Sequence, residues 1–91
     1  MTTEENTATV LALARGMRFA PAQVQHLPAL LASRDASGDD RRLCLECAHL
    51  QARQCRNPVR AGLARHSRSE YVGHDWVTLL QRCPGFAPHQ H

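Results

Sequence analysis

The residues of this chain best suited to chemistry are its four cysteines and six histidines. The cysteines follow the spacing C-x2-C-x7-C-x27-C. A Cys-x-x-Cys pair turns two sulfurs toward one centre, and a tetrahedral Zn²⁺ needs two further ligands. The third and fourth cysteines each stand close to residues that turn or stop a chain, Asn57-Pro58 and Pro84-Gly85. The spacing therefore predicts one structural zinc ion with the ligands Cys44, Cys47, Cys55 and Cys83.

Four other interpretations of these cysteines stay open. An iron–sulfur cluster also uses four thiolates, although the spacing matches neither ferredoxin pattern. A redox dithiol at Cys44 and Cys47 would need a βαβ context, which the sequence does not indicate. Two disulfides would need an oxidising compartment. The last alternative is four unlinked, buried thiols.

A histidine could also replace one cysteine as a zinc ligand. His49 lies close to Cys47, but not at the spacing of a chelating pair. His66 falls on the apolar face of an expected helix, so we expect it to be packed rather than ligating. The remaining histidines are His26, His74, His89 and His91, and we expect the last two to be exposed in a tail that is loose beyond Phe86.

Catalysis is the function class that the residues support least. A catalytic zinc keeps one coordination position open, whereas four thiolates fill the shell. The sequence contains neither the zinc-deaminase signature nor His-Glu-x-x-His. Glu46 stands between two expected ligands and is interpreted as an exposed residue of the knuckle rather than as a general base. We therefore expect a protein that is not an enzyme and has no small-molecule substrate.

The positive charge is concentrated in the same half of the chain as the cysteines. All eleven basic residues are arginine, and the net charge is −2 over residues 1–40 but +5 over residues 41–91. Clustered fixed charge suits a phosphate backbone, which predicts nucleic acid as the partner. Arginine equally suits an acidic protein surface, which is the alternative partner. The expected polyanion-binding residues are Arg53, Arg56, Arg60, Arg65 and Arg68.

Helix signals dominate the first forty residues. Thr2 with Glu5 three residues later fits a capping box, which predicts a helix over about 4–15. Pro21 suits the first position of a second helix, and Pro28 interrupts it, so the segment 21–34 is expected to form two short helical pieces or one helix that begins late. Residues 35–41 are small, polar and turn-forming, which is typical of a linker.

The second half is also predicted to be helical. Asn57-Pro58 favours a helix that runs to about Arg68, and Asp75 can cap a final helix. The segment 70–73 is the only candidate strand. We thus expect a mostly α, zinc-stapled domain with a four-cysteine knuckle and at most one minor hairpin, divided into a helical segment (1–34), a linker (35–41) and a zinc-binding segment with an Arg-rich helix (42–91). Its main buried residues should be Leu27, Leu30, Leu31, Leu63, Trp76, Leu79 and Leu80.

Length and composition fit this small domain. Ninety-one residues form one domain at most, and an aromatic share of 4% leaves few large side chains for its core. No apolar run approaches the roughly 18 residues that span a bilayer, and the first residues do not show a basic n-region followed by an apolar h-region. We therefore expect a cytoplasmic protein that does not contact membranes.

The cysteine blocks also resemble those of a known group of proteins. The segments Cys44–Leu50, Cys55 and Leu80–Phe86 look like the cysteine cluster of small, poorly characterised proteins from proteobacterial plasmids, integrative conjugative elements and phages. The resemblance covers about residues 42–87. It implies a bound metal and a mobile-element setting, and it adds a second functional hypothesis, a protein that binds and modulates a host or defence protein.

Overall fold

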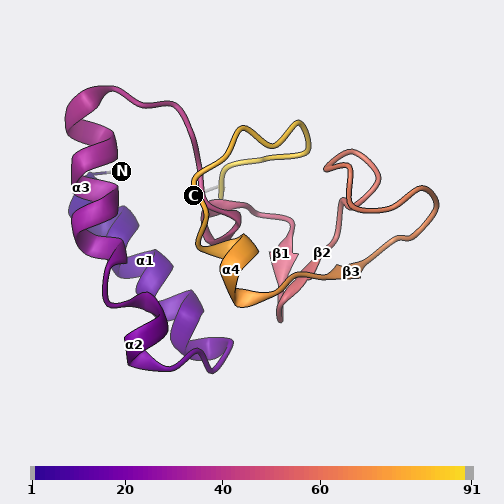
Figure 1. The fold of residues 1–91 in the computed structure, drawn as a ribbon, viewed down its shortest axis with the longest axis horizontal. Coiled ribbons are helices and arrows are strands. Elements are labelled where there is room, and N and C mark those ends of the chain that lie inside the picture. Colours follow the sequence, from indigo (N-terminus) through magenta and orange to yellow (C-terminus); the bar gives the residue numbers. More distant parts are fainter. Residues whose placement is uncertain (1, 90–91) are drawn as a thin grey trace.

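The computed structural model describes residues 2–89 of the chain. Its first half is helical and its second half is built from very short elements (Figure 1). The elements are α1 (Thr3–Gly16), α2 (Pro21–Val24), α3 (Leu27–Ser37), the 3-10 helix η1 (Cys44–Glu46), β1 (Leu50–Gln51), β2 (Gln54–Cys55), β3 (Glu70–Tyr71) and α4 (His74–Val77).

The helical half follows the local signals of the sequence. The Thr2 hydroxyl accepts a hydrogen bond from the Glu5 backbone N–H at 3.1 Å, so the expected cap of α1 is confirmed. Pro21 opens α2, and Pro28 lies in the first turn of a separate helix α3, as expected from the fixed φ of proline. Helix α3 runs on to Ser37, so the connection to the second half begins later than residue 35.

The fold-class prediction is wrong at the sheet. Three strands pair antiparallel in the order β1-β2-β3, so the domain is mixed α/β and not mostly α with one minor hairpin. Strand β3 does lie in the segment 70–73 marked by the sequence. Strands β1 and β2 have two residues each, too few to show an alternating pattern. Their connecting turn, Ala52-Arg53, has positive φ angles of 48° and 63° without the Gly or Asn that usually marks such a turn.

The Arg-rich helix over residues 57–68 is also absent. The chain forms a single turn there, in which the Leu63 N–H donates to the Pro58 carbonyl at 2.8 Å. Gly62 then adopts a left-handed φ of 79°, a conformation that ends helices. Residues 56–69 therefore form a loop between β2 and β3, which we call the basic loop. It extends away from helices α1–α3 toward the opposite end of the molecule (Figure 1).

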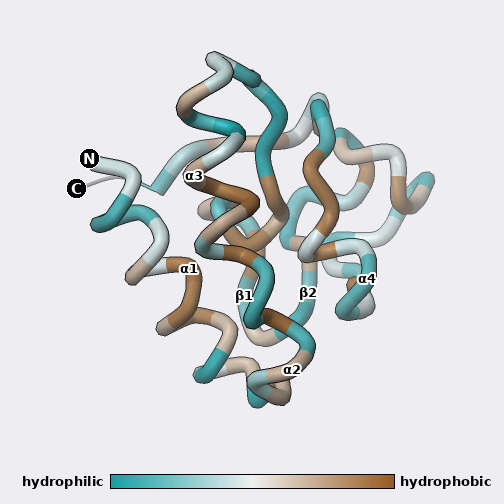
Figure 2. The backbone as a smooth tube through the Cα atoms, turned by 60° about the vertical axis from the view of Figure 1, so that its left-hand side comes forward, coloured by the Kyte–Doolittle hydropathy of each residue, from teal (hydrophilic) through white to brown (hydrophobic). Residues whose placement is uncertain are grey.

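Both halves contribute to one hydrophobic core. Apolar residues recur along α1 and α3, separated by hydrophilic ones (Figure 2). Leu27 and Leu31 are fully buried, as predicted. Leu30, Leu63 and Leu80 are partly buried against this core. The buried cluster consists of Val10, Ala14, Phe19, Val24, Leu27, Leu31, Leu43, Leu45, Leu50, Val72 and Val77.

Two residues expected in the core lie at the surface. Trp76 is 42% exposed and Leu79 is 50% exposed. The physical reason is that α4 is a single turn, capped by Gly73 rather than by Asp75. Because so short a helix does not reach Leu79, the expected apolar stripe along it does not form.

The C-terminal segment is better ordered than the sequence suggested. The Ala48 N–H donates to the Ala87 carbonyl at 2.8 Å, and Cys47 pairs with Pro88 in an antiparallel bridge. The described residues beyond Phe86 therefore lie along the knuckle, the segment that carries Cys44 and Cys47. Within residues 2–89, every helix is too short or too polar to cross a lipid bilayer.

Candidate metal centre and basic loop

The four cysteines come from three separate parts of the fold and line one pocket. Cys44 opens η1 and Cys47 follows it directly, whereas Cys55 ends strand β2. Cys83 comes from the C-terminal segment, which is held beside the knuckle by the antiparallel bridge between Arg42 and Gln81. All four cysteines are free thiols. The pairing of distant segments thus brings together the residues that the spacing singled out.

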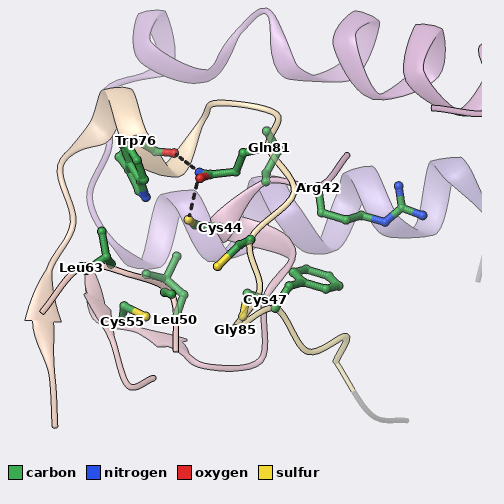
Figure 3. A pocket seen from close by; sticks show the side chains of 13 residues that line it. Arg42, Cys44, Cys47, Leu50, Cys55, Leu63, Trp76, Gln81 and Gly85 are labelled. Carbon is green, nitrogen blue, oxygen red and sulfur yellow. Dashed lines mark hydrogen bonds between the residues drawn. The ribbon is translucent and has the colours of Figure 1, made fainter. Parts of the chain in front are cut away.

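The pocket around the sulfurs is mostly apolar. Figure 3 shows Leu50, Leu63 and Trp76 around Cys44 and Cys55, with the Trp76 indole at one side. The Gln81 side-chain amide donates to Cys44 Sγ at 3.5 Å and to the Trp76 carbonyl at 3.3 Å, so it fixes the position of the tryptophan relative to the thiol. Such a lining excludes water and strengthens electrostatic interactions inside the pocket.

Two of the four sulfurs accept hydrogen bonds from N–H groups. The His49 backbone N–H donates to Cys47 Sγ at 3.4 Å, and the Gln81 side-chain amide donates to Cys44 Sγ at 3.5 Å. Donors directed at sulfur stabilise the thiolate form, which is the form that binds metals.

Burial makes two thiols of the pocket, Cys44 and Cys55, harder to ionise. Burial raises the pKa of Cys44 to about 12, with a further contribution from the other three thiol groups. Burial also raises the pKa of Cys55, against the effect of the Asn57 N–H. Redox-active Cys-x-x-Cys pairs instead have lowered pKa values. The environment of Cys44 therefore does not resemble that of a redox dithiol.

The side chains are not arranged as a formed coordination shell. Among residues 2–89, no three His, Cys, Asp or Glu side chains are placed together so that they could hold a metal ion. The cysteines share the lining of a pocket, and the zinc site stays a prediction.

None of the described histidines lines this pocket. His49 is half-buried and contacts Cys47 only through its backbone N–H, as far as the structure describes its hydrogen bonds. His66 is exposed, so the expectation that it packs on a helix face is wrong. His74 packs edge-on against Phe19 with ring centroids 6.1 Å apart. His91 lies outside the described residues.

Glu46 is buried, contrary to the expectation of an exposed knuckle residue. Its side chain forms an ion pair with Arg34 of α3, and both residues are about 95% inaccessible to solvent. It also accepts hydrogen bonds from Asn6 Nδ2 and from the Leu43 backbone N–H, each at 2.9 Å. Glu46 thus joins the knuckle to both α1 and α3. This role was not visible in the sequence because its partners lie 12 and 40 residues away.

Arg53 does not belong to a free basic face. Its guanidinium lies 4.1 Å from the centre of the Phe19 ring, and its Nε donates to the Met17 carbonyl at 2.8 Å. These contacts attach the β1–β2 turn to the helical half. The interpretation of Arg53 as a polyanion-binding residue is therefore not supported by its position.

The other four expected arginines share one exposed loop. Arg56, Arg60, Arg65 and Arg68 are all exposed, and within residues 2–89 none of them forms a salt bridge. The basic loop contains no Asp or Glu. The only ion-paired arginines of the described chain, Arg34, Arg41 and Arg82, lie outside it. The loop is therefore a concentrated, uncompensated positive charge.

Comparison with family models, with curated proteins and with solved structures found no match for this chain, so the resemblance to mobile-element proteins stays a prediction.

Proposed function

We propose that this chain is a zinc-stapled binding protein, not an enzyme, whose basic loop contacts the phosphates of nucleic acid. The observation on which the proposal depends is the set of four exposed, unpaired arginines on one loop without a carboxylate. Phosphate contacts require fixed positive charge at the surface and no catalytic group. Because these loop arginines are unpaired, their side chains can adjust to the phosphates of an irregular nucleic-acid backbone.

Zinc supplies the rigidity that the cysteine-containing half of the chain otherwise lacks. The segments around the pocket have two to four residues of regular structure each, and a bound ion would join all three of them. Four free thiols around one apolar pocket, two of them already receiving N–H donors, are a suitable donor set for Zn²⁺. We place the protein in the cytoplasm, where cysteines stay reduced and available to the metal.

The second candidate function is the binding of a host or defence protein by a mobile-element protein. The observation that favours it is the exposure of Trp76 and Leu79 at and just after α4. Tryptophan and arginine are both enriched at protein interfaces. An acidic protein surface would use the same basic loop.

A salt titration of nucleic-acid binding tests the first function. Wild-type protein should bind random oligonucleotides at low salt, and log K should fall with log salt by about 0.7 to 0.9 for each phosphate contact. Arg60→Gln or Arg65→Gln should flatten this slope by about one contact each. The matched control is Arg15→Gln on α1, an exposed arginine outside the basic loop, which should leave the slope unchanged.

Two results would contradict the proposal. The first is the absence of binding at low salt, where electrostatic attraction is least screened. The second is an equal effect of the loop and control variants, because binding would then reflect total charge alone. Capture of an acidic protein by the wild-type chain, lost in the Arg60→Gln variant, would favour the second function.

A further inference from the structure

The exposure of Tyr71 is unexpected in a chain with only four aromatic residues. Phe19 is buried at 5% exposure, whereas the Tyr71 ring is 64% exposed, the largest value among the exposed large hydrophobic residues. A small domain gains stability by burying such a ring. Trp76 at least lines the cysteine pocket, but Tyr71 does not. Burial in the core therefore does not explain a tyrosine at this position.

The register of the sheet places Tyr71 on a polar outer face. Leu50 pairs with Cys55, and Cys55 pairs with Glu70, so these positions share the inner face, where Leu50 is buried. Side chains alternate between the two faces of a strand. The opposite face consequently presents Gln51, Gln54 and Tyr71, which are all exposed. We call these three residues the outer face.

The basic loop begins and ends beside this outer face. Arg56 directly follows β2, and Arg68 precedes β3 by two residues. The Ser69 hydroxyl donates to Gln54 Oε1 at 2.6 Å, which attaches the end of the loop to the outer face. An exposed tyrosine and two side-chain amides thus share one face of the sheet, and the unpaired Arg56 and Arg68 adjoin it along the chain. Aromatic rings that stack bases, next to charges that neutralise phosphates, are the usual means of binding unpaired nucleic acid.

We infer that the outer face binds single-stranded nucleic acid, with one base stacked on Tyr71 and the flanking phosphates on the basic loop. The inference rests on the proposed function and narrows its substrate class. Bases in a duplex are already stacked on their neighbours and do not present a free face to the ring. Reading a duplex would also require a helix or ribbon that fills the major groove. The second half of the chain, as described, offers no element of that size, because α4 has a single turn and strands β1 and β2 have two residues each.

The test compares a labelled oligothymidine of about twelve nucleotides with a random duplex of the same length, by fluorescence anisotropy with the full metal-loaded chain. Tyr71→Leu should weaken single-strand binding about 5- to 100-fold, as expected for the loss of one stacked base. Tyr71→Phe should restore wild-type affinity because it keeps the ring. Neither variant should change duplex affinity or the salt slope.

Leu79→Ala is the matched control, since it shortens another half-exposed apolar side chain, just after α4. It should leave single-strand affinity unchanged, and circular dichroism of each variant checks that the fold is kept. If Tyr71→Leu has no effect, or weakens duplex binding equally, the inference is wrong while phosphate binding by the basic loop stands. If the wild-type chain binds neither oligonucleotide, the proposed function itself fails.

Discussion

The helical half (Thr3–Ser37) and the knuckle half (Cys44–His89) reach a defined structure by different means. Helices α1 and α3 have 14 and 11 residues, with apolar residues at helical spacing. The N-cap of α1 and the C-caps of both helices are hydrogen-bonded. No helix or strand in the knuckle half, as described, exceeds four residues. Its backbone is positioned instead by isolated bridges, by single side-chain contacts and, in our proposal, by a metal ion. Short elements of this kind depend on partners that are distant in the sequence.

The two halves are not independent domains, because they share one hydrophobic core. Buried polar contacts also cross between them. Glu46 contacts Asn6 and Arg34, and Arg53 contacts Phe19 and the Met17 carbonyl. The helical half therefore acts as a support on which the knuckle is mounted. Changing the metal, the polar contacts and the backbone geometry one at a time should show how much each contributes to the free energy of unfolding.

Loss of the metal should have the largest effect, and it should reach the whole domain because the two halves share one core. Purified protein should contain about one zinc per chain, and Cys83→Ser or a chelator should abolish the cooperative melting transition. A structural zinc contributes about 10–16 kcal/mol of apparent free energy in small peptides. The matched control, Leu27→Ala in the helical half, should cost only about 2–5 kcal/mol. Elemental analysis and thermal melts followed by circular dichroism make the comparison.

The zinc prediction has a clear contrary result. A metal-free protein with two intact disulfides, or an unchanged melting curve in the presence of chelator, would show that the knuckle is held by other means. Trp76 gives an independent signal, because it is the chain's single tryptophan and lies in the cysteine pocket. Its fluorescence should change when Co²⁺ is added to wild-type protein, but not to Cys83→Ser.

Removal of the Glu46 charge should have the next largest effect, because it uncouples the two halves. Glu46→Gln leaves the buried Arg34 with Asp35 as its one carboxylate partner, and weakening a buried pair in this way should cost up to about 3–5 kcal/mol. Urea denaturation would measure this loss in the free energy of unfolding. The double variant Arg34→Met with Glu46→Leu should recover part of it by removing the buried arginine, although Asp35 then loses its partner and the Leu43 N–H loses its acceptor. A change below about 1 kcal/mol in Glu46→Gln would show that the pair does not join the halves.

Gly85 tests whether the C-terminal segment must pack tightly against the basic loop. A Cβ at this position would lie 3.0 Å from the Ala61 backbone nitrogen and 3.2 Å from Asn57 Nδ2. The Asn57 amide also donates to the Gly85 carbonyl at 3.2 Å. Gly85→Ala should therefore destabilise the protein by about 1–3 kcal/mol.

The matched control for this substitution is Gly16→Ala. Nothing lies within 4 Å of a Cβ at Gly16, at the end of α1. The control should leave the melting temperature unchanged or raise it slightly, because alanine favours the helix. Equal effects of the two substitutions would show that the close approach at Gly85 is unimportant.

The contrast between the halves also explains what the sequence could predict. The cap at Thr2 and the proline positions 21 and 28 act on their own neighbours, so α1 to α3 were predictable. The gathering of the cysteines around one pocket was predictable from their spacing. The burial of Glu46 and the attachment of Arg53 depend on residues far away along the chain, which no local pattern reveals. The prediction of an Arg-rich helix was wrong because it relied on the N-terminal signal at Asn57-Pro58 and did not treat Gly62 as the end of the helix.

A substitution in the β1–β2 turn should have the smallest effect, and it should stabilise the protein rather than destabilise it. Ala52 and Arg53 both have positive φ, which costs about 1 kcal/mol for a residue with a Cβ. Arg53 is needed for its contacts with Phe19 and Met17, so the strain at that position is compensated. Ala52 is exposed and its methyl group has no such role. Ala52→Gly should therefore stabilise the protein by up to about 1 kcal/mol, measured as a higher urea midpoint at constant m-value.

The reverse control is Gly38→Ala, at a φ of 71° after α3, which should lower the midpoint by a similar amount. If Ala52→Gly lowers the midpoint, the entropy that glycine adds to the unfolded chain outweighs the relieved strain, and the positive φ at Ala52 is not a source of instability.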